Sequence, residues 1–143
     1  MSSLEVAVVR RKLGHIVAAL DALRPLAALT PEEYRARLYE RKAAERFLQE
    51  AIEAALDVNA HLLVETGAPV PDDYYSGFIA MGDAGILSPD LARRLAPSAG
   101  LRNRLVHEYD TLDDDRVLAA IRTALEQYPR YIQAIETHLS TGP

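Results

Sequence analysis

The segment Leu101–Asp110 gathers side chains that could act on phosphate esters. No Gly or Pro interrupts it, so the pattern predicts one helix throughout. At about 100° per residue, Arg102 and Tyr109 fall on one face, and Asn103 and His107 lie on the adjoining strip. Arginine offers a permanently charged fork to phosphate oxygens, and histidine exchanges a proton near neutral pH. This combination of a cation, an imidazole and a phenol therefore favours phosphate chemistry.

The composition favours a single helical domain spanning residues 1–143. The chain is 49% hydrophobic, with two Phe and no Trp, so we expect one core of Leu, Ala, Ile and Val. Without cysteine it forms no disulfides, which is typical of a reducing cytoplasm. No apolar run approaches the roughly 20 residues of a membrane span, and charges such as Arg10 and Arg11 interrupt any signal peptide. We therefore expect a cytoplasmic protein that does not enter a membrane.

The charge distribution bears on nucleic-acid binding. A net charge of −5 argues against a generic, sequence-blind nucleic-acid binder, which is normally basic. Four arginines nevertheless cluster around the start of the motif segment. They are Arg93, Arg94, Arg102 and Arg104. We therefore predict a local basic cleft on an acidic protein.

Two long helices are predicted in the first half of the chain. Apolar residues recur at helical spacing over residues 4–23, and Pro25 then ends the helix. Thr30, Pro31 and Glu33 form a helix start signal of N-cap, N1 and N3 residues. No Gly or Pro follows until Gly67, so this helix could reach about 50 Å. Because that length exceeds a small domain, the helix must kink or project.

The second half predicts short helices and one long one. Aspartates at 72 and 73 and Ser88-Pro89 mark the starts of two short helices before the motif segment. The acidic turn Asp110–Asp115 suits the N-terminus of a last helix, which Pro129 should kink. The expected fold is an all-α up-and-down bundle with about four main helices plus short ones.

The motif residues also carry a family resemblance. Arg102, Asn103, His107 and Tyr109 reproduce the pattern R-N-x-x-x-H-x-Y, and the chain resembles HepT-like toxins of the HEPN ribonuclease superfamily. The segment Glu45–Gly67 is similar to the long central helix of that family. The resemblance covers most of the chain from this segment to the motif.

The resemblance implies an endoribonuclease that needs no metal or cofactor. His107 would remove a proton from an RNA 2′-hydroxyl, which then attacks the adjacent phosphorus. Arg102 would stabilise the added negative charge in the transition state. Asn103 would orient the substrate or His107. The products would be a 2′,3′-cyclic phosphate and a free 5′-hydroxyl.

Partners also follow from the resemblance. HEPN proteins of this kind pair as two-fold homodimers with both motifs facing a shared cleft, which an isologous contact provides. In such a type VII toxin–antitoxin pair, an MNT-type nucleotidyltransferase antitoxin attaches AMP to the motif tyrosine, here Tyr109. Because this tyrosine is predicted on the Arg102 face, the added nucleotide would occupy the phosphate site and exclude RNA.

Several alternatives stay open. The domain could be a non-catalytic partner or substrate-binding subunit of a nucleotidyltransferase, or a purely structural helical dimer. Glu53 and Asp57 share one helix face and could support catalysis as an acid and a base, or act as counterions to Arg102. The other histidines, His15, His61 and His138, lack the paired spacing of a metal site, so none is predicted. The complete motif favours the enzyme.

Overall fold

The computed structural model describes residues 1–141, which form helices and connecting turns without any strand. The elements in chain order are α1 (Ser3–Leu23), the 3-10 helix η1 (Arg24–Ala28), α2 (Pro31–Arg35), α3 (Leu38–Thr66), α4 (Tyr74–Asp83), α5 (Pro89–Leu95), α6 (Ser98–His107) and α7 (Asp114–Thr141). The prediction of an all-α, up-and-down bundle is confirmed. No helix in this part of the chain is both long and apolar enough to cross a bilayer.

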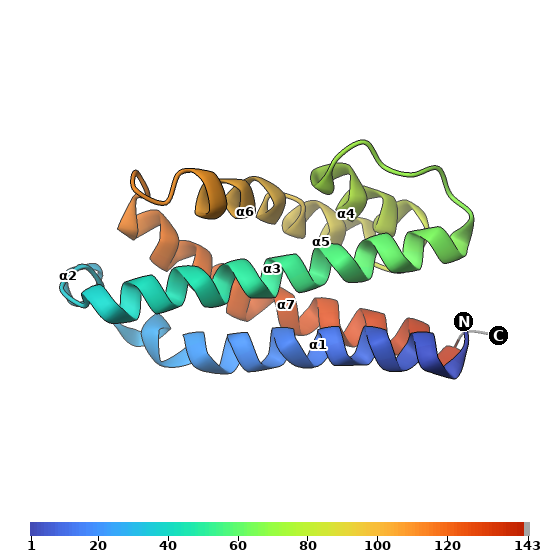
Figure 1. Ribbon diagram of the computed structural model, residues 1–143, viewed down its shortest axis with the longest axis horizontal. Coiled ribbons are helices and arrows are strands. Elements are labelled where there is room, and N and C mark those ends of the chain that lie inside the picture. The colour runs from blue at the N-terminus through green and yellow to red at the C-terminus, as the bar shows by residue number, and fades with distance from the viewer. Residues whose placement is uncertain (142–143) are drawn as a thin grey trace.

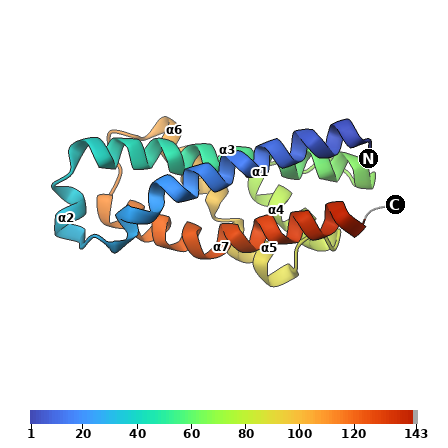
Figure 2. The same ribbon diagram turned by 90° about the horizontal axis from the view of Figure 1, so that it is seen from below.

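Three long helices form the body of the bundle. Helices α1, α3 and α7 lie side by side along the length of the molecule (Figures 1 and 2). Instead of a fourth long helix, the short helices α4, α5 and α6 follow one another along the side of α3 and α7 that faces away from α1 (Figure 1). The motif helix α6 therefore rests on the long central helix, as a part of the outer layer.

The core between these helices is aliphatic, with aromatic residues that composition alone did not anticipate. Ile16 of α1 and Ile52 and Leu62 of α3 are almost completely buried. Four aromatic side chains are equally buried, namely Tyr34, Phe78, Tyr128 and Tyr131. The Tyr131 hydroxyl lies 3.0 Å from the Ala55 carbonyl oxygen and 2.6 Å from Asn59 Oδ1, so this phenol ties α7 to α3.

The predicted single helix from residue 31 to residue 66 is wrong, because the chain turns after Arg35. The N–H of Arg37 donates to the Tyr34 carbonyl at 3.1 Å, a 3-10 bond, and Arg37 then leaves the helical region with φ −107° and ψ 79°. The Tyr34 side chain is fully buried and α2 packs against α7, so burial rather than Gly or Pro bends the chain. The segment is therefore neither a kinked nor a projecting single helix but two helices, α2 and α3, joined by a turn.

The predicted helix starts are confirmed. The Thr30 hydroxyl accepts from the Glu33 N–H, and the Glu33 carboxylate accepts from the Thr30 N–H, which completes a capping box. Asp73 caps α4 through the Ser76 N–H at 2.7 Å. Pro129 lies within α7, which continues as one helix on both sides of it.

Candidate functional site

Helix α6 places the motif on an exposed ridge. Ala99 and Leu105 are buried beneath it against the bundle, while Asn103 and His107 are exposed to solvent. The helix packs against α3 and α4. The apolar inner side of α6 therefore fixes the direction in which the polar residues project, as the sequence pattern predicts.

Arg102 is held against α3 by one carboxylate. Its Nε and Nη2 atoms both donate to Glu53 Oε2, at 3.2 and 3.0 Å. The other oxygen of Glu53 accepts from Gln49 Nε2 at 3.3 Å. The Arg102 side chain is 22% exposed and that of Glu53 34%, so water screens this ion pair only in part. The guanidinium therefore keeps one defined position while it remains accessible.

Two further side chains bound the guanidinium. The Arg102 Cζ lies 5.7 Å from the centroid of the Tyr74 ring, which is a cation–π contact. Arg102 Nη1 donates to Asn103 Oδ1 at 3.3 Å. The contact found for Asn103 is thus with Arg102, whereas the sequence suggested an orienting role toward His107 or the substrate. The sequence does not indicate the contact with Tyr74, because no local pattern links residues this far apart.

The structure separates the two carboxylates that the sequence placed on one face of α3. Glu53 joins Arg102, as one of the predicted counterions. Asp57 instead pairs with Lys12 of α1 at 2.8 Å. The two carboxylates therefore do not act on one group.

The predicted helix from Leu101 to Asp110 is wrong in its last turn. Helix α6 ends at His107, and Glu108 has φ −130° and ψ 31°. The Thr111 N–H and hydroxyl both bond to the Glu108 carbonyl, at 3.0 and 3.1 Å, which closes a turn. The acidic residues that follow would be repelled by the negative end of the helix dipole, which favours the end of the helix at His107.

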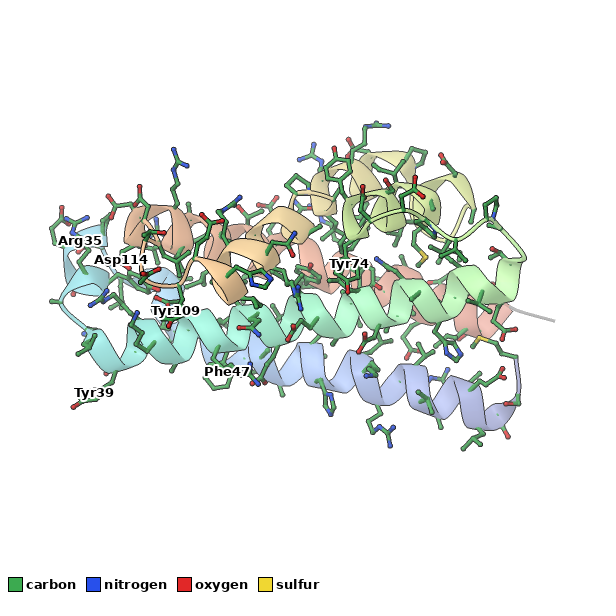
Figure 3. The ribbon with its side chains drawn as sticks, turned by 45° about the horizontal axis from the view of Figure 1, so that its top comes forward. Arg35, Tyr39, Phe47, Tyr74, Tyr109 and Asp114 are labelled. Atoms are coloured by element: carbon green, nitrogen blue, oxygen red, sulfur yellow. The ribbon has the colours of Figure 1, made fainter. Side chains whose placement is uncertain are left out.

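Tyr109 consequently lies outside the motif helix, in the turn, and its side chain is 63% exposed. Figure 3 shows it toward the end of the molecule that carries Arg35 and Asp114, away from Tyr74. Because α6 ends before Tyr109, the helical spacing that predicted one face for Tyr109 and Arg102 does not extend to this tyrosine. The tyrosine is instead two residues from His107.

Two grooves flank α6. The larger one, about 810 Å³, lies between α6, the end of α3 and the loop into α4, and Tyr74 and Asn103 line it. The smaller one, about 330 Å³, lies between α6 and α7, and Arg104 and Glu108 line it. Neither of these two grooves is lined by Arg102 or His107. The two motif residues are thus beside grooves rather than inside a closed pocket.

The predicted basic cleft is largely neutralised. Arg94 pairs with Asp90 at 2.8 Å, and Arg93 approaches the same carboxylate at 4.0 Å. The Arg94 guanidinium lowers the pKa of Asp90 by hydrogen bonding and by its charge. Within residues 1–141 no ion pair is found for Arg104. Of the four arginines of the predicted cleft, Arg104 is therefore the one whose charge no carboxylate balances among the described residues.

Comparison with known proteins agrees with the fold and the motif. The sequence matches the family described as Ribonuclease HepT-like over residues 16–135. The chain belongs to this family. This HepT-like chain is 38% identical to the tRNA nuclease HepT of Aphanizomenon flos-aquae over 141 residues, which covers 99% of the chain and 96% of the relative. It is 27% identical to the mRNA nuclease HepT of Shewanella oneidensis over 89 residues, covering 62% of the chain and 67% of the relative.

A solved structure shares the fold of this HepT-like chain. It is described as a tri-AMPylated Shewanella oneidensis HEPN toxin in complex with MNT antitoxin. The TM-score is 0.81 at 20% identity, and the match covers 96% of the chain and 99% of that toxin. The family match and the 38% identical relative confirm the family resemblance inferred from the motif, and the enzyme class that the motif predicts, an endoribonuclease, is the class of this family.

Proposed function

We propose that this HepT-like chain is the ribonuclease toxin of a toxin–antitoxin pair and cleaves RNA without a metal ion. The observation that carries the proposal is the accessible guanidinium of Arg102, which Glu53 and Asn103 orient on the same helix that exposes His107. His107 removes the proton of a 2′-hydroxyl, and that oxygen attacks the neighbouring phosphorus while the bond to the 5′-oxygen breaks. Arg102 stabilises the negative charge of the transition state.

Completing this reaction calls for a second copy of the chain. Arg102 and His107 are five residues apart, which is about 140° around the helix and about 7.5 Å along it. One chain also supplies a single motif imidazole, whereas the leaving 5′-oxygen needs a proton donor in addition to the base. We propose a two-fold homodimer in which two motif helices border one RNA-binding cleft, so that His107 of one copy acts as the base and His107 of the other copy donates the proton that the leaving 5′-oxygen needs. Exposed apolar side chains beside the larger groove suit such a contact. They are Val64, Val70, Tyr74 and Tyr75.

Glu53 has a supporting role in this proposal. It holds the Arg102 guanidinium in place until a phosphate competes for it, and its second hydrogen bond, from Gln49, keeps the carboxylate itself fixed. We assign this role to Glu53 alone, because Lys12 already engages Asp57.

Tyr109 is the proposed site of inactivation by an MNT-type nucleotidyltransferase antitoxin. Its phenol is exposed in a turn, where a modifying enzyme can reach it. The AMPylated toxin that shares this fold supports the assignment. Each AMP adds a negative charge and a base two residues from His107, so the modification would occupy the phosphate site and repel RNA.

The RNA class and the cellular location are extensions of the same proposal. One relative is named for tRNA and another for mRNA, so these relatives support RNA as the substrate without selecting its class. A fold relative from Bacillus subtilis, YutE, is described as cytosolic, at 17% identity and a TM-score of 0.80. We propose a cytoplasmic location here as well.

Expression of the chain alone tests the toxin proposal against the alternative of a non-catalytic nucleotidyltransferase partner. The wild type should arrest growth and degrade cellular RNA, and His107→Ala should do neither. Coexpression with the proposed MNT-type nucleotidyltransferase antitoxin should restore growth. If the wild type and His107→Ala are equally harmless and leave RNA intact, the partner-subunit function is favoured instead.

A further inference from the structure

A cluster of metal-ligand side chains lies at the end of the bundle where α1 begins and α3 ends. Glu5 comes from the first turn of α1, and His61 and Glu65 come from the last turns of α3. Their ligand atoms all lie within 4.8 Å of one another. Figure 1 places this end of α3, where the N-terminus also lies, away from the far end of α6. The cluster is therefore separate from the motif residues and does not depend on the proposed ribonuclease function.

The charges of the cluster are not balanced. Glu5 and Glu65 bring two carboxylates together, and within residues 1–141 no Lys or Arg forms an ion pair with either of them. Glu5 Oε2 accepts from the backbone N–H of Ser2 at 3.0 Å, so its other oxygen stays available. Two carboxylates at this separation repel each other unless a cation lies between them.

The imidazole of the cluster also lacks a hydrogen-bond partner. The Nε2 of His61 is shielded from solvent and has no hydrogen-bond partner. A shielded ring nitrogen without a partner costs free energy, and metal coordination is one way to satisfy it. The exposed Glu65 leaves the cluster accessible to an ion from solvent.

We propose that Glu5, His61 and Glu65 bind a divalent transition-metal ion of the zinc type. One imidazole nitrogen and two carboxylate oxygens are a ligand set that Zn²⁺ accepts, and two negative charges neutralise a doubly charged ion. Mg²⁺ and Ca²⁺ prefer sites made of oxygen alone. His61 and Glu65 are four residues apart, so they project from one face of α3. The sequence contained this His-x-x-x-Glu spacing, but Glu5, which completes the set, is 56 positions before His61.

The proposed ion joins two helix ends and acts as a structural clamp. It connects the first turn of α1 to the last turns of α3, just before the loop that leads to α4. Because a metal that binds only the folded chain stabilises it by mass action, saturation should raise the melting temperature. When the free metal concentration is a hundred times the Kd, the expected rise in melting temperature is about 5 °C or more.

Titration of the purified, tag-free and chelator-treated chain tests the site. Isothermal titration with ZnCl₂ should give one ion per chain, and CoCl₂ should give a visible absorption band that ZnCl₂ displaces. MgCl₂ should give neither binding heat nor a change in melting temperature. Loss of these signals in the wild type, or equal binding of Mg²⁺, would overturn the proposal.

Variants connect the binding to the three side chains. Glu65→Gln and His61→Ala should each weaken Zn²⁺ binding at least about tenfold, the lower end of the loss expected when a metal site is disrupted. Glu65 is exposed, so Glu65→Gln keeps the test valid if His61→Ala fails to fold. His15→Ala, an exposed histidine on α1, is the matched control and should bind as the wild type does. Equal affinity in Glu65→Gln and the control would indicate binding elsewhere and contradict the assignment.

Discussion

Arg102 and Glu53 form a two-bonded ion pair that fixes the motif helix to the central helix. Both Nε and Nη2 of the guanidinium donate to the same carboxylate oxygen, at 3.2 and 3.0 Å. The pair spans 49 positions of sequence and connects α6 to α3. The Arg102 guanidinium, which is proposed to bind a phosphate, is thus already oriented. The same carboxylate also competes with the phosphate for this cation.

Removing that carboxylate should impair catalysis more than RNA binding. Without Glu53 the guanidinium samples other rotamers, so Glu53→Ala should lower kcat for RNA cleavage about tenfold, which corresponds to about 1.4 kcal/mol of lost transition-state stabilisation. The KM should change little, because loss of the negative charge compensates for the looser arginine. Asp57→Ala, one turn further along α3, is the matched control and should retain wild-type kcat. Faster turnover in Glu53→Ala would show that the carboxylate only inhibits.

Tyr74 should contribute through its ring rather than its hydroxyl. A cation–π contact at a partly exposed site is worth about 0.5–1 kcal/mol, so Tyr74→Leu should weaken cleavage, measured as kcat/KM, about two- to fivefold. Tyr74→Phe should behave like the wild type. Tyr39→Leu is the control, because this exposed tyrosine of α3 lines neither groove and should leave cleavage unchanged. Equal losses in Tyr74→Leu and Tyr39→Leu would contradict a specific role of the Tyr74 ring.

Local patterns predicted the helices far better than they predicted the site. The caps at Thr30 and Asp73 are hydrogen bonds over three residues, so they can be read from the sequence. The turn after Arg35 depends on burial of Tyr34 against α7, which no local signal reveals. The sequence does not predict the end of α6 at His107, because Tyr109 fits the helical spacing. The acidic residues that follow His107 favour the end of the helix there.

Long-range contacts explain the remaining differences. Both Glu53 and Asp57 were eligible partners of Arg102 by helical spacing, and only the packing of α1 beside α3 assigns Asp57 to Lys12. The contact between Arg102 and Tyr74 likewise depends on how α4 lies against α6. The sequence could thus predict which residues are candidates for the site, but tertiary packing determines which of them contact one another.

The cap that starts α4 should make the fold sensitive to acid. Hydrogen bonding from the Ser76 N–H lowers the pKa of Asp73 below its ordinary value of 3.8. A lowered pKa means that the ionised cap stabilises the fold fully above pH 3.8, and that this contribution is lost as the pH falls through the lower pKa of the folded state. Asp73→Ala should therefore melt at a lower temperature than the wild type at pH 7, and the difference should shrink below pH 3.8.

Thermal melts of the wild type, Asp73→Ala and Asp72→Asn across this pH range provide the measurement. Asp72 makes no hydrogen bond or ion pair among the described residues, so Asp72→Asn should follow the wild type. A difference between the wild type and Asp73→Ala that stays constant with pH would mean that the carboxylate of Asp73 does not act as an ionised cap.

Modification of the chain should require the phenol of Tyr109. Coexpression with the proposed MNT-type nucleotidyltransferase antitoxin should raise the intact mass by one or more AMP increments, and Tyr109→Phe should show none. Tyr39, another strongly exposed tyrosine, provides the control, so Tyr39→Phe should be modified normally. Persistence of the increments in Tyr109→Phe would move the modification to another residue. Absence of increments in the wild type would remove the proposed switch while leaving the nuclease untouched.

Cleavage of a defined RNA by the purified chain in the presence of a chelator tests the central claim most directly. The account predicts fragments that end in a 2′,3′-cyclic phosphate and begin with a 5′-hydroxyl, with no cleavage at a position where the 2′-hydroxyl is replaced by hydrogen. His107→Ala and Arg102→Ala should each lower the rate at least about a hundredfold. Fragments with 5′-phosphate ends, a requirement for added metal, or undiminished cleavage by His107→Ala would contradict it.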